Sequence, residues 1–286
     1  MNDKKIIGIY HKDCPDGITA AAVLLRKFPE IELFSLSHSF NEDDLLPILD
    51  VVIPGSEVYF VDYALGVEKF LSKDINVFVI DHHMGLKDSL DKLANKHESL
   101  TYVFDNDKSG ASLAWSYFFP DEELPEVIKH VEDVDLWRLQ YGDDTKYVSN
   151  YLSVNINTPE QMLDLIETGD IEKIKEKGKI MSDYSDVQID RFFDNAEKIQ
   201  LKIGEYIVPA YNIPMMYKSG LGNKLSEKED KAVALFAITG DKVKVSFRSK
   251  DKHSPSSMEL AKNLGGGGHR NAASTEIPLK DFLKML

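Results

Sequence analysis

Histidine and aspartate recur in three short segments near the start of the chain, and both residue types bind divalent metal ions. The first segment holds His11, Asp13 and Asp16, the second is Asp62, and the third is Asp81-His82-His83. Histidine and aspartate ligands suit Mn²⁺, Mg²⁺, Fe²⁺ or Co²⁺ better than structural zinc. Two such ions, held about 3.5–4 Å apart by a shared carboxylate, activate water toward a phosphate ester. The three segments therefore indicate metal-dependent phosphate-ester hydrolysis.

Each of these residues also has an ordinary structural explanation. Asp16 can cap the helix that follows it, Asp62 can belong to a plain turn, and a pair such as His82-His83 often lies on the surface without a ligand. Cys14, the only cysteine, is interpreted as a small buried residue rather than a nucleophile. Chance placement of aspartate or histidine after three strands is much less common than after one, and we therefore favour the metal site.

The apolar pattern predicts how these segments are positioned. Buried strands are expected at 5–10, 31–36, 58–62 and 76–80, with helices at 16–27, 41–49 and 67–72 between them. Strands that alternate with helices predict a parallel, doubly wound sheet with helices on both faces. Ligands of such sheets bind beyond the carboxyl ends of the strands. The candidate residues are therefore expected at one sheet edge.

The rest of the chain predicts further helices and a second domain. Helical spacing covers 110–119 and 124–131, and a charged pattern at 159–203 predicts a helical linker. Strands are expected at 206–211, 231–239 and 242–248, with a hairpin turn at 239–241 and a short helix at 257–263. The predicted fold is α/β, with a doubly wound domain (1–158), the linker (159–203) and a smaller α/β domain (204–286).

A glycine run near the C-terminal end is a candidate phosphate-binding loop. Consecutive glycines expose backbone N–H groups and let a ligand approach closely, above all where a helix begins after them. A flexible linker is the alternative, but His269 and Arg270 follow the run at once, which favours phosphate binding. The candidate substrate-binding residues are Arg248, Gly266, Gly267, Gly268, His269 and Arg270.

The amino-acid composition limits which substrates, cell compartment and membrane association are expected. The net charge of −14 disfavours a protein that grips long nucleic acid and favours a small or short substrate. A single cysteine agrees with a reducing compartment. The polar start and the absence of a long apolar stretch predict neither a signal peptide nor a membrane span. We expect a cytoplasmic protein without a membrane partner, and a homodimer is left open.

Five segments resemble the DHH family of phosphoesterases. Asp81-His82-His83 is similar to the triplet that names the family, and 11–17, 61–62 and 132–137 resemble its other metal-binding motifs. Gly265–His269 is similar to the GGGH signature of the DHH-associated C-terminal domain. The resemblance covers nearly the whole chain, with the motifs in the same order. Within the family, the chain resembles oligoribonucleases and RecJ-like phosphodiesterases.

The resemblance implies a role for each residue. The metal ligands would be His11, Asp13, Asp16, Asp62, His82 and either Asp133 or Asp135, with Asp135 slightly preferred. Asp62 would bridge two metals, His83 would face the substrate phosphate, and Asp81 would orient the histidines. One departure concerns the first motif, in which Cys14 stands two positions before Asp16, where many relatives have aspartate. The second domain would bind substrate, with the active site in the cleft between the domains.

The predicted function is hydrolysis of phosphodiester bonds in short RNA or DNA oligonucleotides or dinucleotides, by water that two divalent ions activate. Mn²⁺ is the preferred cofactor, with Mg²⁺ or Co²⁺ as alternatives. A 3′-phosphonucleotide phosphatase, a RecJ-like single-strand exonuclease and a non-catalytic nucleotide sensor remain open. Tyr63, Trp137 and Tyr217 are candidates for stacking on bases. A dinucleotide-binding oxidoreductase is disfavoured because the first strand–helix turn lacks the Gly-x-Gly-x-x-Gly pattern.

Overall fold

The chain forms two compact units, Met1–Ser182 and Asp183–Leu286, in a computed structural model that describes residues 4–37, 40–71 and 74–286. The first unit is built on a parallel sheet with helices on both faces, and the second is a smaller α/β unit with a mixed sheet. The fold class predicted from the sequence is therefore confirmed.

The first sheet has the strand order β2-β1-β3-β4-β5, and all four pairings are parallel. Its strands are β1 (Ile6–His11), β2 (Glu32–Leu36), β3 (Glu57–Val61), β4 (Asn76–Asp81) and β5 (Leu100–Phe104). The helices of this part of the chain are α1 (Pro15–Lys27), α2 (Glu42–Val51), α3 (Met84–Ala94), α4 (Gly110–Phe118), α5 (Glu126–Asp135), α6 (Asp143–Asn155), α7 (Pro159–Thr168) and α8 (Ile171–Asn195). A 3₁₀ turn, η1 (Val67–Lys69), forms the first half of the segment predicted as a helix at 67–72, whose last residue, Ser72, lies outside the described residues.

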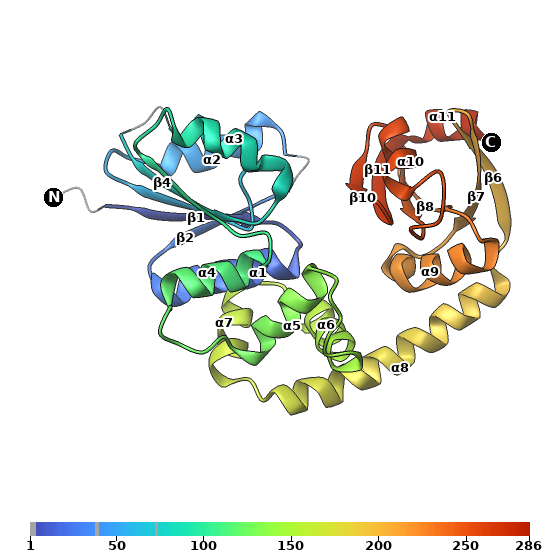
Figure 1. Ribbon diagram of the computed structural model, residues 1–286, viewed down its shortest axis with the longest axis horizontal. Helices are drawn as coiled ribbons and strands as arrows, with labels where there is room; N and C mark the ends of the chain where they lie inside the picture. The colour runs from blue at the N-terminus through green and yellow to red at the C-terminus, as the bar shows by residue number, and fades with distance from the viewer. Residues whose placement is uncertain (1–3, 38–39, 72–73) are drawn as a thin grey trace. The chain divides into compact units, whose positions relative to one another are not determined.

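Two hydrophobic clusters cover the two faces of this sheet. Helices α1 and α4 lie on one face and α2 and α3 on the other (Figure 1). The central strand β3 shows why both faces are covered, because Val58, Phe60 and Val61 are fully buried and Tyr59 nearly so. A continuous apolar run of this kind is typical of a parallel strand between two layers of helices.

The strand order reverses between β1 and β3, since the chain first moves from β1 to β2 and then crosses back to β3. Such a reversal leaves a crevice beyond the carboxyl ends of the two strands, where ligands of doubly wound sheets bind. His11 is the last residue of β1, Asp62 follows β3, and Asp81 ends β4. The predicted residues therefore do lie at one edge of the sheet.

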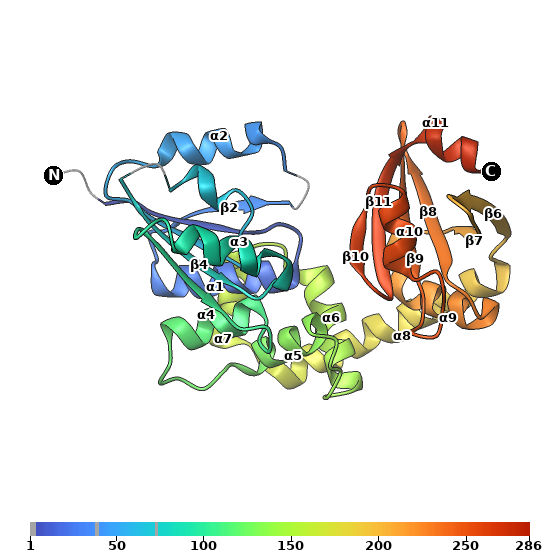
Figure 2. The ribbon, with the colours of Figure 1, turned by 45° about the horizontal axis from the view of Figure 1, so that its top comes forward.

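The second unit contains a six-stranded sheet of order β10-β11-β9-β8-β7-β6. Its elements are β6 (Lys198–Ile203), β7 (Tyr206–Asn212), η2 (Met215–Tyr217), α9 (Lys218–Glu229), β8 (Val233–Thr239), β9 (Lys242–Arg248), α10 (Ser257–Asn263), β10 (Gly267–His269), β11 (Ala272–Pro278), α11 (Leu279–Phe282) and η3 (Leu283–Met285). Helix α10 packs against β9 and β11 (Figure 2). The predicted hairpin turn joins β8 to β9, with Gly240 at a φ of 62°.

The segment predicted as a helical linker differs from the prediction at both ends. Met162 of α7 and Ile174 of α8 are buried in the core of the first unit. Residues 198–203 form β6, because Ile199, Leu201 and Ile203 alternate with polar residues and direct every second side chain to the second core. Within the described ranges, no helix is long and apolar enough to cross a membrane.

Candidate metal centre

Asp62 lies at the centre of the cluster of histidines and carboxylates. Its side chain is 1% exposed, and its backbone adopts a left-handed conformation with φ of 51°. The Asp62 N–H donates a hydrogen bond to the Ile80 carbonyl at 3.0 Å, which fixes the residue just beyond the sheet. The strand end and this local turn therefore direct a buried carboxylate into the crevice.

The two oxygens of the Asp62 carboxylate face different histidines. Oδ1 lies 3.2 Å from Nε2 of His82, and Oδ2 lies 3.5 Å from Nδ1 of His11. Nε2 of His82 is also 3.5 Å from Oδ2 of Asp135 and 3.8 Å from Oδ2 of Asp16. The structure thus brings together five predicted ligands, with His11, Asp16, His82 and Asp135 gathered around Asp62.

Asp16 is not the cap of its own helix. No side chain caps α1, which begins after Cys14, and the Asp16 carboxylate instead accepts hydrogen bonds from Gly110 N–H at 2.6 Å and Ala111 N–H at 3.1 Å. These are the first N–H groups of α4, where the helix dipole favours negative charge. Asp16 therefore joins the start of α4 to the carboxylate cluster.

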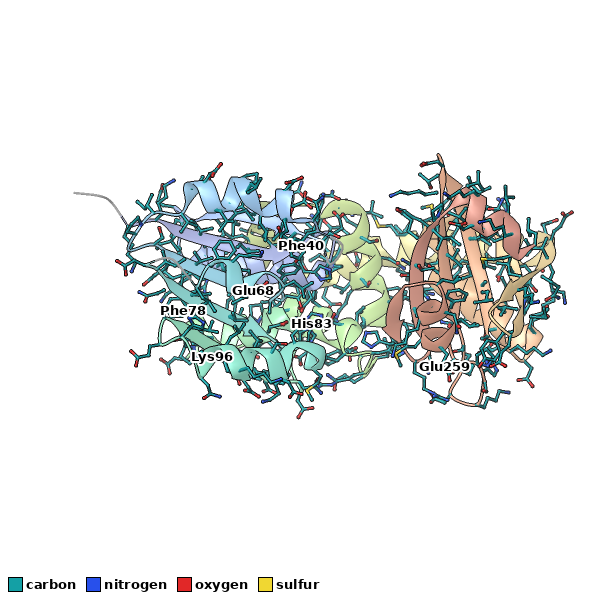
Figure 3. All side chains as sticks on the ribbon, turned by 90° about the horizontal axis from the view of Figure 1, so that it is seen from above. Phe40, Glu68, Phe78, His83, Lys96 and Glu259 are labelled. Carbon is teal, nitrogen blue, oxygen red and sulfur yellow. The ribbon has the colours of Figure 1, made fainter. Side chains whose placement is uncertain are left out.

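Asp81 holds both histidines of the triplet. Its Oδ1 accepts a hydrogen bond from the His82 backbone N–H at 2.9 Å and another from Nδ1 of His83 at 2.7 Å. His83 lies between His82, which follows β4, and the start of α3, and its side chain is 34% exposed (Figure 3). With Nδ1 engaged by Asp81, the tautomer and ring orientation of His83 are fixed.

Crowding of charge shifts the pKa values in the cluster. Burial, and then the charges of Asp62 and Asp135, raise the pKa of Asp16 well above its usual value. Burial alone would raise the pKa of Asp62, but the ring nitrogens of His11 and His82 outweigh it and hold that pKa below its usual range. Burial lowers the pKa of His83, but the hydrogen bond and charge of Asp81 outweigh burial and raise it to about 9.

The donor set fits divalent cations. Oδ2 of Asp62 and Oδ2 of Asp81 are buried, and among the described residues neither has a hydrogen-bond partner. A buried polar atom left in this state costs about 1–3 kcal/mol, and more when it is charged. A cation held by these carboxylates and imidazoles would remove this cost and the repulsion among Asp16, Asp62 and Asp135.

The structure places two predicted ligands elsewhere. Asp13 is exposed, with φ of 56°, and belongs to none of the close ligand groups found among the described residues. The Asp133 carboxylate accepts hydrogen bonds from Gln140 N–H at 2.9 Å and Tyr141 N–H at 3.3 Å. It therefore organises the loop after α5, whereas Asp135, at the end of the same helix, faces His82.

Cys14 is close to the cluster, and its place was not predicted. Its Sγ lies within 4.8 Å of ligand atoms of both His11 and Asp62. The sequence signal was its position two residues before Asp16, where the resemblance leads one to expect an aspartate. Burial raises the pKa of the Cys14 thiol, and the charges of Asp62 and Asp16 raise it further.

The predicted substrate-binding residues of the second unit fall into two groups. Arg248 is 8% exposed, and its guanidinium donates to the Phe247 carbonyl at 2.8 Å and to Oγ of Ser219 at 3.1 Å, both neutral. Lys218 is an exposed residue, but partial desolvation of its ammonium group lowers its pKa and the charge of Arg248 lowers it further, so the two cations are neighbours. The sequence did not point to Lys218.

The glycine run forms a turn and an edge strand instead of the start of a helix. Gly267, Gly268 and His269 make up β10, which pairs with β11 alone, and all three are exposed. Gly266 must be glycine because an added Cβ would lie 2.3 Å from the Ser274 carbonyl oxygen. Arg270 is exposed and donates to the Asp251 carbonyl at 2.9 Å.

Of the residues suggested for base stacking, Tyr63 is fully buried and its hydroxyl donates to the Ser37 carbonyl, so it cannot take this role. Trp137 is 66% exposed in the loop after α5. Its φ of 54° is unusual for a bulky residue. Tyr217 lies in the second unit, in η2.

Comparisons with known proteins agree with this architecture. Residues 215–286 match the model of the DHHA1 domain. The uncharacterized protein R106 of Acanthamoeba polyphaga mimivirus is 24% identical over 292 aligned residues, which cover 95% of this chain and 67% of that protein. The DHHA1 match lies within the second unit and contains Arg248 and the glycine run.

Two solved structures share the fold over nearly the whole chain. RecJ from Thermus thermophilus, in complex with Mn²⁺, has a TM-score of 0.57 and 13% identity, covering 98% of this chain and 51% of RecJ. The pGpG-specific phosphodiesterase PggH from Vibrio cholerae has a TM-score of 0.50 and 13% identity, covering 98% and 95%. The chain thus spans about half the length of RecJ. Residues 215–286 thus match the DHHA1 domain, and the chain as a whole shares its fold with RecJ and the pGpG-specific phosphodiesterase.

Proposed function

We propose that this protein is a metal-dependent phosphoesterase that hydrolyses phosphodiester bonds of short oligonucleotides or dinucleotides with water activated by two divalent cations. One observation carries the proposal, namely that the two oxygens of buried Asp62 face His11 on one side and His82 on the other. A carboxylate that faces two sets of ligands is suited to hold two cations side by side.

The residues divide between the two cation sites. Asp62 contributes to both, His11 belongs to one side, and Asp16, His82 and Asp135 belong to the other. Two divalent cations, Mn²⁺ or alternatively Mg²⁺ or Co²⁺, would lower the pKa of water and neutralise the phosphate. The hydrogen bonds of Asp16 to the start of α4 keep its carboxylate oriented toward this site.

His83 is suited to act on the substrate directly. Asp81 holds its Nδ1, and the ring is partly exposed at the edge of the cluster. We assign Nε2 of His83 the task of donating a hydrogen bond to a phosphate oxygen, where negative charge grows in the transition state. Asp81 acts through His83 and His82 and has no contact with substrate in this proposal.

Basic residues of the second unit indicate which class of substrate the protein binds. Arg248 is a buried cation whose hydrogen bonds go to neutral groups, and Lys218 adds a second cation beside it. A substrate phosphate would compensate both, and Gly266 with the exposed residues Gly267–Arg270 would extend this contact. Because the net charge of the whole chain, −14, opposes long polyanions, a dinucleotide or short oligonucleotide fits best.

The test is hydrolysis of a 5′-labelled RNA dinucleotide, a short RNA, a long single strand and 3′-phosphoadenosine 5′-phosphate, each with Mn²⁺ and with EDTA. The Asp62→Asn variant serves as the blank. We expect Mn²⁺-dependent cleavage that favours the shortest RNA. Release of phosphate from 3′-phosphoadenosine 5′-phosphate alone would support the 3′-phosphonucleotide phosphatase, and preference for the long strand would support a RecJ-like exonuclease.

A non-catalytic nucleotide sensor is the remaining outcome. It predicts binding of a dinucleotide, measured by calorimetry, without turnover of any phosphoester by folded protein with Mn²⁺ bound. That result would contradict the proposed hydrolase. An Arg248→Met variant that no longer binds the dinucleotide while still binding Mn²⁺ would locate recognition in the second unit under either outcome.

A further inference from the structure

The cation site on the His11 side of Asp62 has two ligands so far, His11 and Asp62, and Cys14 lies where a third ligand would be expected. Cys14 directly precedes α1, and its Sγ, a ring nitrogen of His11 and a carboxylate oxygen of Asp62 all lie within 4.8 Å of one another. Gly17 makes this closeness feasible, because a Cβ there would lie 2.3 Å from the His11 carbonyl oxygen. The first turn of α1 can therefore pack directly on the end of β1.

A second observation, independent of the cysteine, indicates a cation at the same place. Oδ2 of Asp62 faces Nδ1 of His11 at 3.5 Å, is buried, and has no hydrogen-bond partner among the described residues. The side chain that carries it is 1% exposed. Burial of a carboxylate oxygen in this state is costly unless a cation or a donor compensates it.

We propose that Cys14 is a thiolate ligand that completes a cation site with His11 and Asp62, and that this site prefers Zn²⁺, Co²⁺ or Fe²⁺ to Mn²⁺ and Mg²⁺. The inference rests on the two-cation centre of the proposed function and assigns the two sites different chemistry. Thiolate and imidazole favour the softer cations, whereas the carboxylate-rich set of Asp16, His82 and Asp135 suits Mn²⁺ or Mg²⁺. The thiol proton passes to solvent when the cation binds.

The chain offers a sharp spectroscopic test, since Cys14 is its only cysteine. Co²⁺ is added to the full-length apo protein, and the sulfur-to-cobalt charge-transfer band in the near ultraviolet is followed. Any such band must come from Cys14. In parallel, the rate of alkylation by iodoacetamide is measured without metal, with Zn²⁺ and with Mg²⁺. We expect a saturable band and strong protection of the thiol by Zn²⁺, with little protection by Mg²⁺.

Two variants isolate the sulfur. Cys14→Ser should lack the band and bind Zn²⁺ and Co²⁺ at least roughly tenfold more weakly, the lower end of what loss of even an outer partner of a metal site costs. Cys14→Asp should lack the band but bind Mn²⁺ better relative to Zn²⁺ than the unaltered chain does. Circular dichroism of each variant checks its fold, and the spectrum of the unaltered chain decides the matter if one variant fails to fold.

The outcomes separate this inference from the proposed function. Tight Co²⁺ binding by equilibrium dialysis, without a charge-transfer band and with an unchanged alkylation rate, would overturn the role of Cys14 and leave the two-cation hydrolase intact. Failure of the folded chain to bind any of the divalent ions would overturn both. Two results together would support the inference. The unaltered chain would show a charge-transfer band that both variants lack, and Zn²⁺ but not Mg²⁺ would protect its thiol from alkylation.

Discussion

Nε2 of His82 lies 3.2 Å from Oδ1 of Asp62, the shortest of its three approaches to carboxylate oxygens. The two residues come from different parts of the chain and meet because β3 and β4 are parallel neighbours that end at the same edge. Asp62 thereby joins the His82 side of the cluster to the His11 side. Removal of its charge should affect both sides at once.

Asp62→Asn should lower kcat/KM by roughly 10²–10³-fold or more, because it removes charge from the shared ligand of the centre. Asparagine tolerates the left-handed backbone of Asp62, so the fold should persist, whereas alanine would add strain. Asp13→Asn is the matched control, since Asp13 also has positive φ but is exposed. Steady-state kinetics with Mn²⁺ measures both, and equal losses would contradict the central role of Asp62.

Asp133→Asn and Asp135→Asn should separate stability from metal binding. Loss of the Asp133 charge weakens its hydrogen bonds to Gln140 and Tyr141 and should lower the free energy of unfolding by about 1–3 kcal/mol. Asp135→Asn should leave stability nearly unchanged and weaken Mn²⁺ binding. Urea unfolding of the apo proteins and Mn²⁺ titration measure the two effects. The reverse assignment of effects would show that Asp133 is the ligand.

The sequence predicted the sheet and most of the cluster because continuous apolar strands determine where Asp62, Asp81 and His82 must lie. It could not separate Asp133 from Asp135, which are two residues apart, because the choice depends on where α5 ends and which way the following loop turns. It also could not place Cys14. At Asp13 the chain enters the left-handed region, and that backbone turn leaves Asp13 exposed while Cys14 lies near His11.

The glycine run shows a second limit of the sequence. Four glycines allow many conformations, and only pairing of β10 with β11 selects an edge strand. The linker prediction failed at 198–203 for a related reason. A charged pattern with few helix breakers masked the alternation of Ile199, Leu201 and Ile203, which pairs β6 with β7.

Glu229 gives the second unit a stability that depends on pH. The Tyr211 hydroxyl donates to its carboxylate at 2.6 Å and Lys198 Nζ lies 3.0 Å away, and these contacts outweigh burial and hold the pKa of Glu229 below its ordinary value of 4.5. Since the folded pKa is the lower one, this contribution is fully present above pH 4.5 and is lost as pH falls through the folded pKa.

Glu229→Gln should therefore destabilise the protein by about 1 kcal/mol at neutral pH and by less under acid conditions. Urea unfolding at neutral and acid pH, monitored for both proteins, measures the difference. Glu205→Gln is a control on an exposed carboxylate of the same unit and should change stability little at either pH. A difference between Glu229→Gln and the unaltered chain that grows toward acid pH would contradict this assignment.

Gly110→Ala should damage the metal centre although the substitution usually favours a helix. In an exposed helix, alanine is better than glycine by about 1 kcal/mol. At Gly110, however, the added Cβ would lie 2.5 Å from Cβ of Asp62 and 2.9 Å from its Oδ1, so Asp62 must move.

Gly85→Ala is the matched control for this substitution. Gly85 lies in the first turn of α3, where a Cβ meets nothing within 4 Å. We expect Gly110→Ala to weaken Mn²⁺ binding and lower kcat/KM, and Gly85→Ala to retain both with equal or higher stability. Metal titration and thermal unfolding of the two variants provide the measurement. Unchanged metal affinity in Gly110→Ala would mean that the position of Asp62 tolerates displacement, contrary to its role as the shared ligand.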